Sequence, residues 1–288
     1  MSQQPLAYLD PGFLESFEAR PLRLMAEYLE PLRRFKEQKI QDTVVFFGSA
    51  RVNSLHRAER ALKTLSSRGV SEADHEYQAE LQKSRKAVEW ARYYEDAREL
   101  GYQLTAWSQT LPSENHRFVV TSGGGPGIME AANRGAHDAG GKTIGLNIRL
   151  PYEQSANRYI TDGLHFEFHY FFMRKFWFAY MAAAIVVFPG GFGTCDELFE
   201  ILTLAQTDKL SKKIDVILYG REYWEQVLNL EPMAEWGAIA RQDMDLLHHA
   251  DTPDEAFEHL KEHLLAHHFL PPDNGQADEA PGLAKTRG

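Results

Sequence analysis

The feature that most constrains the fold is a glycine-rich turn between an apolar run and a helical pattern. The run from Ala182 to Phe188 has no polar side chain, which is typical of a strand buried on both faces of a sheet. It leads directly into Pro189-Gly190-Gly191-Phe192-Gly193-Thr194-Cys195-Asp196-Glu197, after which apolar residues recur at helical spacing. We therefore expect a buried strand, a turn and a helix N-terminus in that order.

A turn of this composition suits an anion. Glycines let a ligand approach the backbone without meeting a Cβ atom. A helix N-terminus adds unpaired N–H groups and the positive end of a dipole. Thr194 is expected to cap the helix, with Glu197 completing a capping box, so these two residues also have a purely structural interpretation as a helix start.

A second glycine-rich turn occurs earlier, at Ser122-Gly123-Gly124-Gly125-Pro126-Gly127. It lies between the strand pattern of 117–121 and a helix over 128–139, and another strand pattern follows at 143–148, which makes a βαβ unit. No Lys-Ser/Thr follows its last glycine, and Ile128 occupies the last position of a G-x-G-x-x-G pattern. Neither a Walker loop nor a dinucleotide fingerprint is present, so ATP hydrolysis and NAD use are not supported.

Strands and helices alternate along the chain, which predicts an α/β fold with a mostly parallel sheet and helices on both faces. The first strand pattern, 43–47, ends at Ser49, at the carboxyl edge where open α/β sheets place ligands. The last strand is expected at 214–219.

The expected organisation has three parts. Residues 1–40 form a helical arm in which Pro31 breaks or restarts the helix. The main domain is 41–270, with a charged helical insertion at about 54–110 that is long for one crossover and so is expected to protrude in part or lie across the surface. The tail, 271–288, is rich in Pro, Gly and Asp and is expected to be disordered.

Composition and net charge limit the kinds of partner that we expect for this chain. The chain has 288 residues and a formal net charge of −10, which argues against nucleic acid and anionic membranes as partners. Its single cysteine allows no intramolecular disulfide, and no secretory signal or membrane-spanning run is recognisable, so a cytoplasmic location is expected. The adjacent cations Arg174 and Lys175 stand in an aromatic segment, where they need either a carboxylate in a salt bridge or an anionic ligand.

From about Val44 to Leu228 the motifs and their spacing resemble the LOG (Lonely Guy) phosphoribohydrolases, often labelled "lysine decarboxylase family", and above all the longer bacterial members. The resemblance implies a Rossmann-like fold and hydrolysis of nucleoside 5′-monophosphates, such as AMP or cytokinin ribotides, to free base and ribose 5-phosphate. It also implies homodimers or assemblies of dimers with the site near the dimer interface, and no metal or organic cofactor. Shorter plant members have M-H-x-R-K where this chain has Phe172-Met173 before Arg174, which leaves the preferred base open.

The resemblance assigns the catalytic roles to Arg174 and Glu197, and phosphate binding to the second turn. A carboxylate beside the ribose stabilises oxocarbenium character or activates water, which suits Glu197. Glu130 is either a second carboxylate on the ribose or an ordinary acid in the first turn of a helix. The residues expected to line the substrate and phosphate site are Gly124, Gly125, Gly127, Gly190, Gly191, Gly193, Thr194, Ser49, Lys175, Glu130 and Met173.

Other interpretations compete. Cys195 is a nucleophile or simply a buried thiol. The alternating His165, Glu167 and His169 form a metal set or a polar strand face. His259, His263 and His267 line one face of the last helix and are expected to be solvated. For the whole chain, a non-catalytic nucleotide or molybdenum-cofactor carrier and a scaffold that uses the insertion are the alternatives to the enzyme.

Overall fold

A parallel seven-stranded sheet forms the centre of the computed structural model, which describes residues 5–67, 74–150, 155–207, 209–210 and 212–269. The strand order is β4-β3-β2-β1-β5-β6-β7, and every pair is parallel. The strands are β1 (Thr43–Phe47), β2 (Val119–Ser122), β3 (Thr143–Ile148), β4 (His165–Phe168), β5 (Ala182–Val187), β6 (Asp215–Tyr219) and β7 (Leu247–Ala250). The expected α/β class is confirmed, whereas the tail at 271–288 lies outside the described residues.

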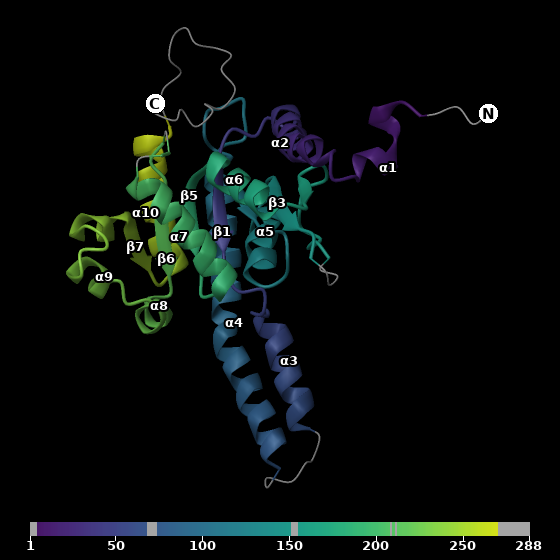
Figure 1. Ribbon diagram of the computed structural model, residues 1–288. Helices are drawn as coiled ribbons and strands as arrows, with labels where there is room; N and C mark the ends of the chain where they lie inside the picture. Colours follow the sequence, from purple (N-terminus) through teal and green to yellow (C-terminus); the bar gives the residue numbers. More distant parts are fainter. Residues whose placement is uncertain (1–4, 68–73, 151–154, 208, 211, 270–288) are drawn as a thin grey trace.

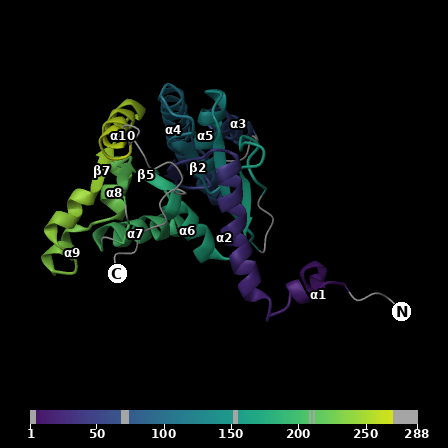
Figure 2. The ribbon, with the colours of Figure 1, turned by 90° about the horizontal axis from the view of Figure 1, so that it is seen from above.

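Helices cover both faces of this sheet, as expected (Figures 1 and 2). Alternate residues of β1 point to opposite faces. Val44 and Phe46 pack with α4, α5 and α10, and Val45 and Phe47 pack with α2, α6 and α7. The helices are α1 (Pro11–Leu14), α2 (Arg20–Glu37), α3 (Leu55–Ser66), α4 (His75–Ser108), α5 (Ile128–Asp138), α6 (Phe171–Met181), α7 (Phe192–Gln206), α8 (Arg221–Val227), α9 (Glu231–Glu235) and α10 (Pro253–His267), with 3₁₀ turns η1 (Ala7–Leu9) and η2 (Arg241–Leu246). Among the described residues, none of these helices is both long and apolar enough to cross a membrane.

The strand order reverses between β1 and β5. From β1 the chain moves outward through β2, β3 and β4, then returns to place β5 on the other side of β1 and continues to β7. This reversal is a topological switch point, and loops that leave it at the carboxyl edge diverge to opposite faces and leave a crevice for a ligand. Both glycine-rich turns follow strands at or next to this point.

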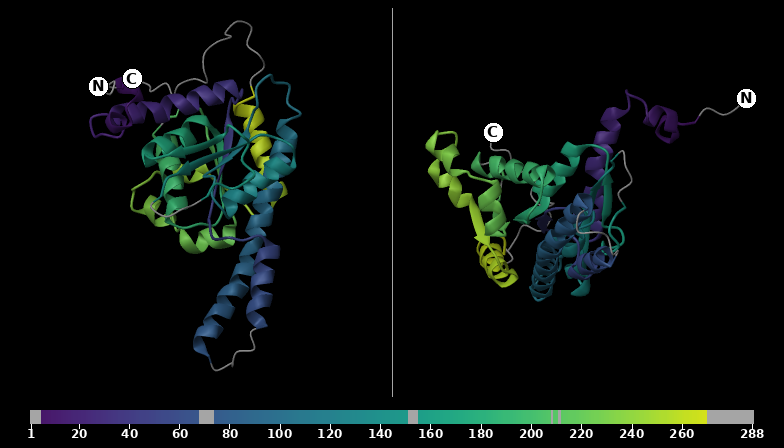
Figure 3. Two further views of the ribbon diagram at one scale, coloured as in Figure 1. Left: turned by 90° about the vertical axis from the view of Figure 1, so that its right-hand side faces the viewer. Right: turned by 90° about the horizontal axis from the view of Figure 1, so that it is seen from below.

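The insertion forms a helical hairpin that extends away from the sheet (Figures 1 and 3). The buried residues of α4 all lie in its C-terminal half, from Ala91 to Thr105, where it packs on the sheet and on α5. Its N-terminal half runs alongside α3 beyond the sheet edge. The expectation that part of the insertion protrudes is confirmed.

The N-terminal arm corrects one expectation, because α2 runs through Pro31 without a break. Proline has no N–H, so the carbonyl of Glu27, four residues earlier, loses its partner within the helix. The indole Nε1 of Trp177 on α6 donates to that carbonyl at 2.9 Å. A donor from another helix thus satisfies the oxygen that Pro31 leaves free, and the helix continues.

The seventh strand corrects a second expectation, because β6 is not the last strand. Strand β7 lies at the edge, pairs with β6, and is only half-buried over Leu247–His249. A four-residue edge strand that contains two histidines gives no continuous apolar run, and for this reason the sequence pattern did not indicate it.

Candidate active site

Three turns meet at the switch point: the turn after β1, which contains Ser49, and the two glycine-rich turns after β2 and β5. Ser49 is hydrogen-bonded to both of the other turns. The Ser49 N–H donates to the carbonyl of Pro189 at 3.0 Å, and the Ser49 carbonyl accepts from the N–H of Ile128 at 3.1 Å. Gly127 has a φ of +72°, and a Cβ there would lie 2.3 Å from the Ser49 oxygen, so only glycine fits. The structure therefore brings the two glycine-rich turns together at one edge, as the sequence indicated.

The second turn starts α7 earlier than expected. Gly191, in an extended conformation, is the N-cap, and within the described chain no side chain caps this helix. The expected capping box of Thr194 and Glu197 is therefore wrong. Thr194 is instead buried, and its hydroxyl would lie 2.1 Å from a Cβ added at Gly190.

The rest of this turn is open. A Cβ at Gly191 or Gly193 would meet no described atom within 4 Å, and both glycines are exposed. The first N–H groups of a helix have no carbonyl partner one turn earlier, so the start of α7 presents donors to solvent or to an anion.

The cation expected beside this turn is present. Arg174 Nη2 lies 3.8 Å from Glu197 Oε1, and the two side chains are 16% and 6% exposed. A Cβ at Gly123 would lie 3.9 Å from the same Nη2 atom, so the guanidinium stands between the first turn and Glu197. Among the described residues the buried Nε of Arg174 has no hydrogen-bond partner. The site thus contains a loosely paired cation with a donor to spare.

Lys175, which was expected to contact the substrate phosphate, is surrounded by carboxylates. Its Nζ is 2.8 Å from Asp196, 3.1 Å from Glu197 and 2.7 Å from Glu200. All three carboxylates belong to α7, so Lys175 ties α6 to α7. In this geometry it holds the second oxygen of Glu197, and its proposed contact with a substrate phosphate stays a prediction.

Burial and the neighbouring charges together set the protonation of this cluster. It raises the pKa of the Glu197 carboxyl, against the opposing charges of Lys175 and Arg174. Burial lowers the pKa of the Arg174 guanidinium, which Glu197 partly offsets. For Lys175, burial acts downward, but the neighbouring carboxylates outweigh it and raise the pKa of the ammonium. Glu197 is thus a carboxylate with a raised pKa beside two cations, a pattern common at catalytic sites.

Burial also raises the pKa of the Cys195 thiol, which disfavours the thiolate that nucleophilic chemistry needs. Cys195 therefore lies in the first turn of α7 but lacks the lowered pKa of an activated cysteine. Within the described residues no group of three or more His, Cys, Asp or Glu side chains is arranged to hold a metal ion.

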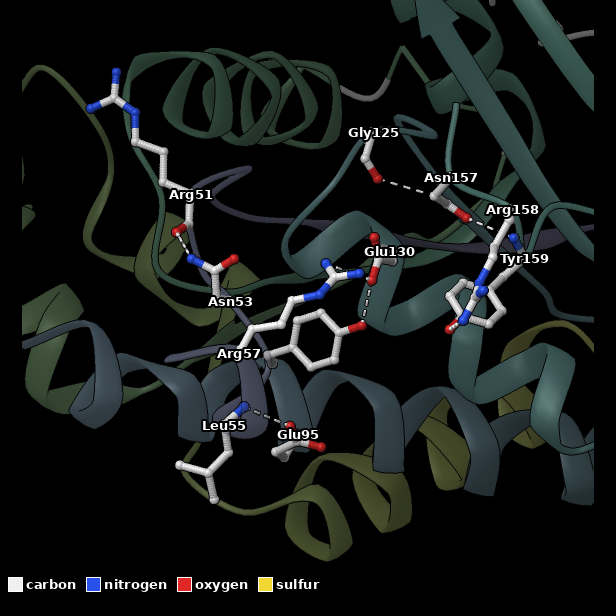
Figure 4. Close-up of polar contacts among 11 residues, drawn as sticks. Arg51, Asn53, Leu55, Arg57, Glu95, Gly125, Glu130, Asn157, Arg158 and Tyr159 are labelled. Atoms are coloured by element: carbon white, nitrogen blue, oxygen red, sulfur yellow. Dashed lines mark hydrogen bonds and ion pairs between the residues drawn. The ribbon is translucent and has the colours of Figure 1, made fainter. Parts of the chain in front are cut away.

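The first turn is fixed by amides that sequence reasoning missed. Asn157 donates its N–H to the Gly124 carbonyl at 2.8 Å and its Nδ2 to the Gly125 carbonyl at 3.1 Å (Figure 4). The buried Asn133 accepts from the Ser122 hydroxyl at 2.6 Å and from Asn157 at 2.9 Å. Nothing in the sequence separates these asparagines from others in loops and helices.

Glu130 points toward the hairpin. Its carboxylate accepts from the Tyr94 hydroxyl at 2.8 Å. It also lies 3.4 Å from Arg57 Nη1, and Figure 4 shows the Arg57 side chain extending toward it. Burial and this hydrogen bond raise the pKa of Tyr94. The partners of Glu130 thus belong to α3 and α4, whereas Arg174 and Glu197 belong to α6 and α7. A role on the ribose stays a prediction.

Two further expected site residues have structural contacts. Met173 is half-buried and packs against the core on the α6 side of the sheet, and the Ser49 hydroxyl accepts from the Arg51 N–H at 3.1 Å. Sequence reasoning missed Tyr223 of α8, whose hydroxyl donates to the Gly190 carbonyl at 2.7 Å and so supports the second turn.

Comparison with known proteins agrees with the motifs. Residues 129–260 match the model of the family described as "possible lysine decarboxylase". The chain is similar to this family over that stretch, which is a little less than half of its length. A probable cytokinin riboside 5′-monophosphate phosphoribohydrolase of Arabidopsis thaliana is 29% identical over 149 residues, covering 52% of this chain and 74% of that protein. A cytokinin riboside 5′-monophosphate phosphoribohydrolase of Oryza sativa subsp. japonica is 29% identical over 181 residues, covering 60% and 68%.

Solved structures with a related course of the chain include two proteins of molybdenum-cofactor biology. The cofactor-binding protein of Rippkaea orientalis is 18% identical with a TM-score of 0.44, covering 76% of this chain and 94% of that one. The cofactor carrier protein of Chlamydomonas reinhardtii is 20% identical with a TM-score of 0.42, covering 77% and 98%.

The part of the chain that matches the possible lysine decarboxylase family contains the whole second turn, Arg174, Lys175 and Glu197. It begins at Met129, just after the first turn, and so excludes β1, Ser49, the hairpin and the arm. The resemblance stated from the motifs is confirmed at the level of the family.

Proposed function

We propose that this chain hydrolyses the N-glycosidic bond of nucleoside 5′-monophosphates, AMP or a cytokinin riboside 5′-monophosphate, to free base and ribose 5-phosphate. The observation that carries the proposal is the buried Arg174–Glu197 pair beside an open, anion-accepting helix start. The curated relatives named above are phosphoribohydrolases of this kind, which supports the reaction class.

Each group has a role that its surroundings favour. The 5′-phosphate binds at Gly191 and Gly193, where no described side chain occupies the space around the helix start. Glu197, as the carboxylate, stabilises positive charge on the ribose carbon or takes a proton from the attacking water. Arg174 orients that carboxylate and offers its unpartnered Nε–H to the substrate. The water adds to the anomeric carbon, and the base leaves with the electron pair of the broken C–N bond.

The catalytic assignment predicts the behaviour of Glu197→Gln. Base release from AMP should fall by about 100-fold or more, because a neutral amide can neither accept the proton nor stabilise the cation. The variant should unfold at a temperature equal to or above that of the wild type, because the raised pKa shows that the fold favours a neutral group there. Chromatography of the released base and a thermal melt measure the two effects.

Glu200→Gln is the matched control. It removes a carboxylate from the same helix and the same lysine, one turn further on, and should reduce base release far less. An equal loss in both variants would assign the effect to the charge balance at Lys175 and contradict a catalytic role for Glu197.

The substrate is settled by incubating the purified chain with AMP, other nucleoside monophosphates and a cytokinin ribotide. Nucleotide binding without release of base from any of them would contradict the enzyme and favour a carrier. We also propose, from the family resemblance alone, that the chain forms homodimers, which sedimentation would test.

A further inference from the structure

The arm and the start of α6 are joined through one acidic residue. Glu27 of α2 accepts from the His169 N–H at 2.7 Å through Oε1 and from the Tyr170 N–H at 3.3 Å through Oε2. Tyr170 is the N-cap of α6, and in the described chain its own side chain makes no capping hydrogen bond. A carboxylate from another helix therefore accepts the N–H of the N-cap residue, as the acidic residue of a capping box does, at the positive end of the α6 dipole.

The same residue holds α6 at a second point. The Glu27 carbonyl accepts from Trp177 Nε1 at 2.9 Å, and Trp177 is 1% exposed. Tyr28 and Phe35 of α2 pack against the Trp177 ring, with centroids 5.8 and 5.3 Å away. Helix α6 is thereby fixed both before its first turn and near its middle.

The cap and the proposed catalytic cation share one helical turn. The Arg174 N–H donates to the carbonyl of Tyr170, the residue whose own N–H bonds to Glu27. Arg174 reaches Glu197 only at 3.8 Å, without the close contact that would hold the pair by itself. Its other contacts are with the rings of Phe171 and Phe178, at 6.0 and 5.3 Å on the same helix, so its position against Glu197 depends on where α6 is placed.

We propose that Glu27 is a positioning residue for the site: by capping α6 from the N-terminal arm, it sets the distance between Arg174 and Glu197. The inference rests on the proposed function. It gives the arm, which lies outside the segment that matches the family model, a part in the reaction.

The test compares Glu27→Ala, Glu27→Gln and the control Glu37→Gln. Glu37 lies on the same helix but pairs with Arg33 at the surface, with 55% of its side chain exposed. Glu27→Ala should lower kcat for AMP by about 10- to 100-fold, as expected for a misplaced group, with a much smaller change in KM. Glu27→Gln should recover most of the loss, because its amide oxygen still accepts an N–H, and Glu37→Gln should match the wild type.

The pH profile separates positioning from mere stability. The charged groups that face Glu197 are Arg174 and Lys175 of α6 and Glu200 of α7. If Arg174 moves away, Glu197 keeps its proton to a higher pH, so the acidic limb of kcat should move upward in Glu27→Ala. A variant that melts earlier but keeps the wild-type kcat and acidic limb would overturn the proposal.

A readout independent of turnover keeps the two proposals apart. The titration of the Glu197 carboxyl carbon, followed by NMR and assigned with Glu197→Gln, should shift to higher pH in Glu27→Ala. If the wild type releases no base, the proposed function fails, and the titration alone decides the role of Glu27. An unchanged midpoint would refute the positioning role even in an active enzyme.

Discussion

Glu197 stabilises the native state less than an exposed glutamate would. Burial raises its pKa above the usual range of a glutamate, in spite of two neighbouring cations. The folded chain therefore binds the Glu197 proton more tightly than the unfolded chain does. Its contribution to stability is present at low pH and is lost as the pH rises through the folded pKa. Ionisation of this buried carboxyl therefore costs the folded state free energy.

Lys175 should set the pH at which this carboxylate ionises. Lys175→Gln removes the cation 3.1 Å from Glu197, so the pKa of Glu197 should rise further and the acidic limb of base release should move to higher pH. The pH profile of kcat measures this shift. Lys261→Gln on α10, whose partner Glu258 is at the surface, is the control. A limb that stays in place would show that Lys175 does not govern Glu197.

The sequence was informative where residue type and spacing alone define the chemistry. The second turn and Arg174 stood out because a glycine-rich helix start suits an anion and a cation in an aromatic segment needs a carboxylate or an anionic ligand, whereas the catalytic roles of Arg174 and Glu197 came from the family resemblance and stay a proposal. Asn133 and Tyr223 could not be selected, because each acts through a partner 11 or 33 residues away that only the fold brings near. The direction of Glu130 likewise depended on where the hairpin packs.

At the scale of elements, α2 and α6 are linked by a hydrogen bond that Pro31 makes available. Trp177→Phe should destabilise the fold by about 1–3 kcal/mol, because it leaves the Glu27 carbonyl buried without a donor. In a Pro31→Ala background the same substitution should cost less, since the alanine would supply the helical N–H that proline lacks. Denaturant unfolding of the four proteins in this double-mutant cycle gives the coupling. Equal costs in both backgrounds would contradict the link.

Acid should destabilise the fold through His268, the C-cap residue of α10. His268 lies against the Lys213 carbonyl at 2.7 Å, near His263, Asp42 and Lys212. Burial lowers its pKa to about 4, below the roughly 6.5 of an unfolded histidine. The unfolded chain thus takes up the proton first, and stability falls as the pH drops from about 6.5 toward 4.

This predicts a smaller acid-induced fall in melting temperature for His268→Gln, which keeps a donor to Lys213 but does not titrate. Melting curves between pH 7 and pH 4.5 provide the measurement. His56→Gln, on the exposed surface of α3, should behave like the wild type. A wild-type slope in His268→Gln would locate the acid sensitivity elsewhere.

The expectation that the histidine face of α10 is solvated is wrong in part, since His259 pairs with Asp215 at 3.0 Å and stacks on His248.

Element boundaries show where local pattern was sufficient. Strands β1 and β3 were placed at their observed bounds, because β1 is an almost continuous apolar run and β3 follows the glycines that end α5, so neither needed wider context. The start of α7 was misplaced because an extended glycine, and not a capping side chain, precedes the helix. The edge strand β7 has too few apolar residues to be recognised without its neighbour.

For the whole molecule, alternation of strands and helices was enough to predict a parallel sheet covered on both faces. The order of the strands, and with it the switch point, was not predicted, because pairing of β1 with β5 joins segments separated by most of the domain. The docking of the arm onto α6 was likewise not predicted from the sequence. Both are long-range contacts, which local patterns do not determine.

The strand order also has a consequence for the order of synthesis. Strands β1 to β4 emerge first and can pair in sequence, but β1 then waits with one edge unpaired until β5 follows about 135 residues later. That edge is wholly apolar from Val44 to Phe47 and offers a template to other chains. The junction between the two glycine-rich turns therefore forms late, on the ribosome as in refolding. Nascent chains that stop before β5 therefore expose the aggregation-prone edge of β1, which β5 covers in the complete fold.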